Sequence, residues 1–106
     1  MTEPKGRKRE GGSPSAGRRP AVRGAGDAAR RAARALTELI GRRLEGVSAV
    51  RPGEDGGWIV DVDVLELARV PDTTSLLATY RVELDREGEL VQYRRVARYW
   101  RGARDR

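Results

Sequence analysis

The chain has 106 residues, with 22 Lys and Arg against 16 Asp and Glu, and it contains no Cys, His or Phe. This length supports at most one small domain, and the missing Cys and His exclude a disulfide framework, a thiolate nucleophile, a zinc ribbon and the commonest general base. No run approaches the roughly 18 apolar residues of a membrane span, and the charged N-terminus lacks the apolar core of a secretory signal. We therefore expect a soluble intracellular protein.

The net charge of +6 is unevenly spread along the chain. Residues 1–26 carry +5, residues 27–93 carry −4 and residues 94–106 carry +5. The part that is expected to fold is therefore mildly acidic, with a cationic extension at each end. A domain that binds nucleic acid through its fold should instead carry its positive charge on a structured face.

Residues 1–26 are rich in Gly, Pro, Ser, Arg and Lys, and Val22 is the one aliphatic residue among them beyond Met1 and a few Ala. So little apolar surface does not offset the entropy cost of ordering the segment, which predicts a disordered basic tail. Such a tail can bind RNA, DNA or an acidic protein surface, or it can simply be solvated. We favour the solvated tail.

Residues 27–44 are predicted to form a helix, with Asp27 as its N-cap and Gly46 as a stop signal beyond its end. An apolar stripe recurs there at helical spacing. It consists of Ala29, Ala33, Leu36, Ile40 and Leu44, with Ala32 and Leu39 beside it. The stripe is small, Ala-rich and without an aromatic anchor, so we expect it to cover a sheet and not to insert into a membrane surface.

After residue 46 the apolar period changes from about 3.6 to 2, which predicts strands. Residues 47–50 are a short strand candidate, and residues 52–57 form a loop bounded by Pro and Gly. Residues 58–67 are the strongest strand: Trp58 and the even-numbered Val residues point to one face, and Ile59, Asp61 and Asp63 point to the other. The alternation slips at residues 65–67, which indicates either a bulge or a switch of face.

Residues 69–75 interrupt the sheet, because Pro71 cannot donate to a ladder and residues 72–75 can cap a helical turn. Residues 76–85 are the third strand, and residues 85–88 are a tight hairpin turn in which Gly88 supplies positive φ. Residues 89–97 are the fourth strand. Its poor alternation leaves open whether Val91 and Tyr93 or Leu90 and Val96 face the helix.

These elements predict an α+β fold, with one N-terminal helix packed on a small antiparallel sheet of three to four strands and a disordered basic N-terminal tail. About 70 ordered residues fold with little margin, because a domain of that size hides only about 60% of its unfolded surface. The second face of the sheet is therefore a candidate for a partner.

Asp61, Asp63 and Glu66 form the one dense carboxylate group of the chain. They could hold a divalent cation or act as an acid and base pair, but metal sites usually need more ligands, and we favour a solvent-facing group paired with Arg81 or Arg95 across the sheet. Residues 53–57 lack the Lys and Ser or Thr of a phosphate-binding loop, and no His is present to activate a hydroxyl. We expect no catalytic residue, metal site, cofactor or small-molecule substrate.

Residues 93–101 interleave aromatic rings with guanidinium groups. Three interpretations stay open: Tyr93 and Trp100 lie in the core with solvated Arg around them, or the segment is a protein-binding edge, or bases stack on it while Arg holds phosphates. The candidate partner-binding residues are Tyr93, Arg95, Arg98, Tyr99 and Trp100.

Several segments, in this order and spacing, resemble the gas vesicle protein O family. They are the helix end Leu39-Ile40-Gly41, residues 57–66 (GWIVDVDVLE), 69–73 (RVPDT), 78–85 (ATYRVELD) and 88–99 (GELVQYRRVARY). The match covers roughly residues 30–101 and ends in a specific Tyr-x-Arg-x-x-Arg-Tyr pattern. The expected division is a basic tail in residues 1–26, a gas vesicle protein O-like α+β domain in residues 27–101 and a basic end in residues 102–106.

The resemblance implies a non-enzymatic accessory protein in gas vesicle formation, an assembly or interaction factor that contacts other gas vesicle proteins. Accessory proteins and shell proteins are both candidates. Gas vesicles are protein-walled, gas-filled compartments in the cytoplasm, so the cytoplasm is the expected location, and association with the vesicles stays open. The alternative is a small basic RNA- or DNA-binding regulatory protein that uses its two cationic ends. Nucleic acid is the less favoured partner, and no membrane partner is expected.

Overall fold

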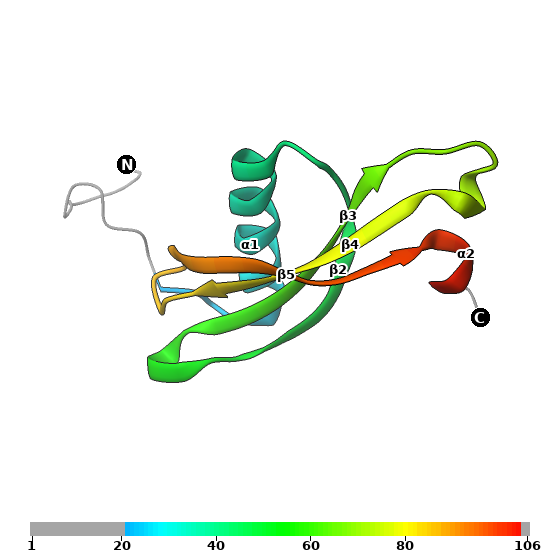
Figure 1. Cartoon of the computed structure of the whole chain (residues 1–106). Coiled ribbons are helices and arrows are strands. Elements are labelled where there is room, and N and C mark those ends of the chain that lie inside the picture. Colours follow the sequence, from blue (N-terminus) through cyan, green and yellow to red (C-terminus); the bar gives the residue numbers. More distant parts are fainter. Residues whose placement is uncertain (1–20, 105–106) are drawn as a thin grey trace.

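The computed structural model describes residues 21–104, which form one long helix over one face of an antiparallel sheet (Figure 1). The long elements are α1 (Ala25–Ile40), β2 (Arg43–Pro52), β3 (Trp58–Leu67), β4 (Leu76–Leu84) and β5 (Leu90–Trp100). The short ones are η1 (Glu54–Gly56), η2 (Asp72–Thr74) and α2 (Arg101–Arg104). The four strands lie side by side in chain order, which confirms the predicted α+β fold. Residues 1–20 of the predicted tail lie outside the described residues.

The helix α1 begins and ends earlier than the sequence predicts. Gly24 is its N-cap and makes no side-chain cap bond, so the prediction of Asp27 as N-cap is wrong; Asp27 lies in the first turn. Gly41 ends the helix in the left-handed conformation, with φ 64°, where a residue without a Cβ meets no steric penalty. Because the helix stops there, Leu44 belongs to β2 and not to the helical stripe.

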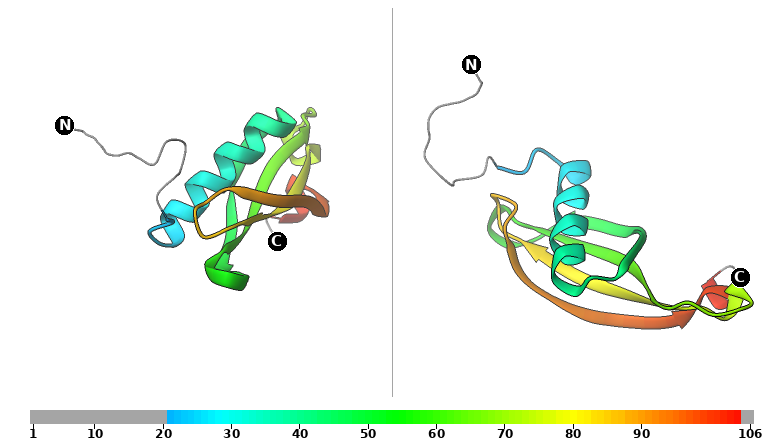
Figure 2. Two further views of the ribbon diagram at one scale, coloured as in Figure 1. Left: turned by 90° about the vertical axis from the view of Figure 1, so that its left-hand side faces the viewer. Right: turned by 90° about the horizontal axis from the view of Figure 1, so that it is seen from above.

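The hydrophobic core lies between α1 and one face of the sheet (Figure 2). Its buried residues are Ala28, Ala32 and Leu36 of α1 with Val60, Val62, Val64, Ala78, Val82 and Leu84 of β3 and β4. The even-numbered Val residues of β3 thus share one face, as predicted, and this is the face that packs on the helix. The stripe of α1 has a different phase from the prediction, because the buried helical residues run back from Leu36 in steps of four to Ala32 and Ala28. Ala residues are adjacent at 28–29 and at 32–33, so the sequence does not show which member of each pair faces the sheet.

The strand β3 has the predicted bounds, whereas β2 and β5 are longer than predicted. The register of β3 against β4 shifts between Leu65 and Leu67, which confirms the predicted bulge. The register of β5 against β4 also shifts twice, so that Val91 and Val96 lack an opposing residue. Because Val91 is extra, Leu90 and Tyr93 both lie opposite helix-facing residues of β4, a combination that neither predicted alternative contains.

The hairpin between β4 and β5 is tied to the start of α1. Arg31 donates from Nη1 to the carbonyl oxygen of Glu87 at 2.5 Å, and the Val22 N–H donates to the Arg86 carbonyl oxygen at 2.9 Å. Gly88 has φ 85°, as predicted for this turn. Among the described residues, no helix has both the length and the apolar character needed to cross a membrane.

Candidate functional site

The five candidate partner-binding residues all lie on β5, which is an edge strand of the sheet. Residues that lie directly opposite each other in an antiparallel pair share a face. Four of the five lie opposite even-numbered residues of β4, on the face that carries α1: Tyr93, Arg95, Arg98 and Trp100. Tyr99 lies opposite Leu77 on the other face. We call the four residues on the helix side the β5 surface.

Glu66 holds the two arginines of the β5 surface in place. Its side chain is only 8% exposed, and its carboxylate pairs with Arg95 Nη1 at 3.1 Å and with Arg98 Nε at 2.9 Å. The two arginine side chains are themselves about half exposed. Each guanidinium has five N–H donors, more than one shared carboxylate accepts. The pair is therefore positioned while donors remain for another acceptor.

The two aromatic residues of the β5 surface are exposed to solvent. Trp100 is 49% exposed, and the guanidinium carbon of Arg69 lies 5.6 Å from the centre of its ring, within the range of a cation–π contact. Tyr93 is 38% exposed, with its ring centre 6.2 Å from that of Tyr80. The interpretation that places Tyr93 and Trp100 in the core is therefore wrong, because both side chains are exposed and Leu90 is the residue of β5 that packs against the core.

Apolar residues from other strands extend this surface over the part of the sheet that lies beside α1 (Figure 2). Leu67 lies opposite Leu76 and is 46% exposed, and Leu44 lies opposite Val64 and is 43% exposed. In the right-hand view of Figure 2 the sheet continues past α1 toward α2. Glu66, Leu67 and Leu44 were not predicted to belong to a binding surface. The predicted bulge at residues 65–67 was the available signal, since it places Glu66 beside the arginines of β5.

The other face of the sheet holds Asp61 and Asp63. Both are buried, so the prediction that they face solvent is wrong. Arg81 donates to both carboxylate oxygens of Asp61, at 2.9 and 3.1 Å, and the Thr79 hydroxyl donates to Asp63 at 2.6 Å. The hydrogen bonds to Asp61 raise the pKa of Arg81. The predicted pairing with Arg81 is thus confirmed, and neighbouring strands shield both carboxylates.

The predicted carboxylate group does not assemble, because Glu66 turns toward the helix-side face while Asp61 and Asp63 lie on the other. Within residues 21–104 no group of three or more acidic side chains is arranged to hold a metal ion.

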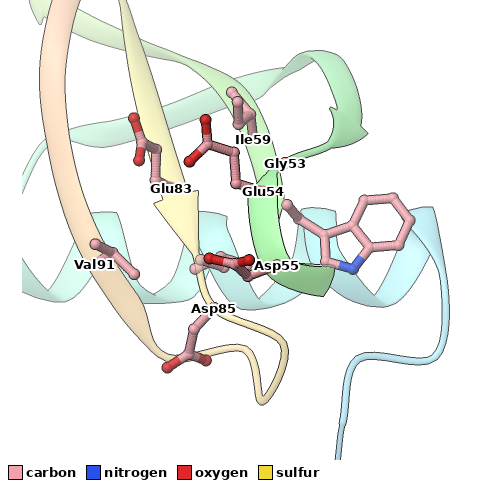
Figure 3. A pocket seen from close by; sticks show the side chains of 9 residues that line it. Gly53, Glu54, Asp55, Ile59, Glu83, Asp85 and Val91 are labelled. Carbon is pink, nitrogen blue, oxygen red and sulfur yellow. The ribbon is translucent and has the colours of Figure 1, made fainter.

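A cleft of about 440 Å³ lies at the hairpin end of the sheet and carries acidic residues (Figure 3). Two of its carboxylates stabilise local structure: Asp85 accepts the N–H groups of Glu87 and Glu89, and Glu83 accepts the side-chain amide of Gln92. In Figure 3 the carboxylate of Asp85 points away from those of Glu54 and Glu83. The acidic groups therefore do not converge on a common point, and we assign no chemistry to this cleft.

The fold and this surface together define a small α+β protein with one helix on an antiparallel sheet and a cluster of arginine and aromatic residues at one sheet edge. Comparison with known proteins gives its family. Residues 12–105 match the family model described as "Gas vesicle synthesis protein GvpO". The chain therefore belongs to the gas vesicle protein O family, which confirms the resemblance seen in the sequence.

Three relatives are named as members of the same family. The chain is 62% identical over 71 residues to gas vesicle protein O of Streptomyces sp. strain CB03234, an alignment that covers 67% of this chain and 55% of the relative. It is 34% identical over 79 residues to gas vesicle protein O of Haloferax mediterranei, covering 74% and 56%. It is 35% identical over 72 residues to gas vesicle protein O1 of Halobacterium salinarum, covering 68% and 60%.

The chain thus spans little more than half the length of the curated relatives that it matches. No solved structure was found to match it. The family description names a role in synthesis and no chemical reaction.

Proposed function

We propose that this chain is a non-enzymatic interaction factor in gas vesicle synthesis, which binds other gas vesicle proteins through the β5 surface. Two findings support the proposal: the family of the chain, and a set of exposed aromatic and arginine side chains that the core does not use. Tyr, Trp and Arg are the residues that most often dominate protein interfaces. Because Glu66 already positions Arg95 and Arg98, binding costs less side-chain entropy.

We propose the cytoplasm, where gas vesicles form, as the place of this activity. We propose residues 27–101, extended by the start of α1 and by α2, as the folded unit between two basic ends. Accessory and shell proteins of the vesicle are both candidate partners. The RNA or DNA alternative has less support, because residues 27–93, which form most of the described fold, carry a net charge of −4.

Co-purification with gas vesicle proteins tests the proposal. A tagged full chain carrying Tyr93→Ala and Trp100→Ala is expressed in a gas-vesicle-forming host, and the gas vesicle proteins that co-purify with it are quantified by mass spectrometry. Tyr99→Ala is the matched control, because Tyr99 lies on the same strand and faces the other way. With folding checked by circular dichroism, we expect the double variant to lose these proteins and the control to keep them. Equal recovery with both variants would contradict the proposal.

A further inference from the structure

The geometry of the β5 surface points to a specific kind of partner. Resting on the proposed function, we propose that this surface accepts an acidic amphipathic helix of a partner protein. The helix packs on the sheet beside α1, on the same face. The proposal follows from three properties of the surface, namely its uncovered area, its interrupted strand edge and its charge.

The first property is the area that α1 leaves uncovered. A helix of 16 residues is about 24 Å long and about 10 Å wide. Four strands of 9 to 11 residues form a sheet about 19 Å wide and about 30–36 Å long. One helix cannot cover such a face. The uncovered part carries Leu44, Leu67 and Trp100, each between 43% and 49% exposed.

The second property is the irregular outer edge of β5, which argues against an added strand. An added strand needs a regular row of backbone donors and acceptors, and bulges interrupt such a row. Val91 and Val96 are both extra residues in the register of β5, so the regular stretches between and after them are short. Docking on the face does not depend on that row. A helix on the sheet face also repeats the packing that α1 already makes.

The third property is the charge around the apolar residues. Arg69 lies over the ring of Trp100, and Arg95 and Arg98 share the single carboxylate of Glu66. A carboxylate of the partner would find guanidinium donors that Glu66 leaves unused. Leu44 and Leu67 would pack against an apolar stripe on the same partner. An amphipathic helix with acidic flanks provides such a stripe. A second copy of this chain would bring like-charged arginines together, which disfavours self-association.

Peptide binding to the full chain tests the proposal. The probe is a designed amphipathic helix of about 16 residues, with Leu along one face and Glu elsewhere. A second peptide replaces every Glu by Lys, and a third keeps the composition but scrambles the apolar period. Amide NMR should show the Glu peptide shifting the signals of residues 66–67 and 93–100. No binding of the Glu peptide, or equal binding of the Lys or the scrambled peptide, would overturn the proposal.

Substitutions sharpen this test, because they predict changes of opposite sign. Glu66→Gln removes the competing carboxylate while keeping its shape, and should tighten binding of the Glu peptide up to about fivefold. Trp100→Ala should weaken it about tenfold or more, and Arg98→Gln should weaken it and reduce its dependence on salt. Arg94→Gln is the matched control on the other face, and it should change nothing.

The outcomes separate this proposal from the proposed function. Binding of the Glu peptide that is unchanged in Arg98→Gln and does not weaken as salt is added would overturn the acidic partner. Preference for an oligouridine RNA over the Glu peptide would overturn a protein partner of this chemistry. If no peptide binds while co-purification with gas vesicle proteins still depends on Tyr93 and Trp100, the proposed function stands and the acidic helix is rejected.

Discussion

At the start of α1, one carboxylate joins the first turn of the helix to the β4–β5 hairpin. Asp27 accepts the N–H of Arg23 at 3.1 Å and pairs with Arg31 at 3.1 Å, and Arg31 in turn reaches Glu87. The hydrogen bond from Arg23 lowers the pKa of Asp27, and Arg31 lowers it further, although burial opposes both. A negative charge in the first turn also interacts favourably with the positive end of the helix dipole.

We therefore expect Asp27→Asn to lower the stability of the fold by an amount that depends on pH. A carboxyl group whose pKa is lowered in the folded state stabilises the fold above its unfolded pKa of about 4. That contribution disappears as the pH falls through the lower, folded value. Thermal melts should show Asp27→Asn melting below the wild type at pH 7, with the difference shrinking below about pH 4. A difference that stays constant down to pH 2 would contradict this role.

Gly57 is the second residue whose identity the fold requires, because the backbone of β4 approaches it closely. A Cβ at this position would lie 2.3 Å from the carbonyl oxygen of Leu84. We expect Gly57→Ala to lower the free energy of unfolding by about 1–3 kcal/mol in urea titrations. Gly46→Ala is the control, since a Cβ there meets nothing within 4 Å. Equal stability of the two variants would contradict this expectation, because it would show that the β2–β3 hairpin relaxes around the added methyl group.

Among the secondary-structure elements, α1 contributes the helical half of the core and Leu36 is its largest fully buried side chain. Truncating Leu36 to Ala removes contacts with β3 and β4 and should cost about 2–5 kcal/mol. Leu39→Ala is the matched control three residues along the same helix, because Leu39 is 55% exposed. Its cost should stay within about 0.5 kcal/mol. Chemical denaturation that ranks the two variants the other way would contradict the observed face of α1.

An element could be predicted where its pattern of apolar and charged residues shows which side is buried. The strand β3 was predictable because apolar and charged residues alternate along residues 60–64 in its middle. The face of α1 was not, because the neighbouring pairs of Ala at residues 28–29 and 32–33 fit either phase. The end of α1 was misplaced because Gly46 was taken as the stop, whereas Gly41 adopts the left-handed conformation first.

The candidate site shows the same limit more sharply. Its residues were predictable as a group, since arginines and aromatic rings gather in one segment. The face on which each residue lies was not predictable. Val96 is an extra residue in β5, so every residue after it lies on the opposite face from the one that simple alternation predicts. Odd-numbered Tyr93 and Arg95 therefore share a face with even-numbered Arg98 and Trp100, and Tyr99 is separated from Tyr93. A period-two pattern cannot reveal such a shift.

In the molecule as a whole, the two faces of the sheet differ in how they are completed. One face is partly covered by α1 and continues into exposed leucine, tryptophan and arginine side chains beyond it. On the other face, Asp61 and Asp63 are buried through pairing with Arg81 and Thr79. A partner is therefore expected on the helix side, where apolar surface remains exposed.

The central claim is that the chain supports gas vesicle synthesis by contact through the β5 surface. Complementation tests it most directly: a host whose own copy of this gene is deleted receives either Tyr93→Ala/Trp100→Ala or Tyr99→Ala, and vesicles are counted by electron microscopy. With both proteins shown to be folded and equally abundant, we predict that the Tyr99 variant restores vesicles and the double variant does not. Normal vesicle numbers with the double variant would contradict the claim.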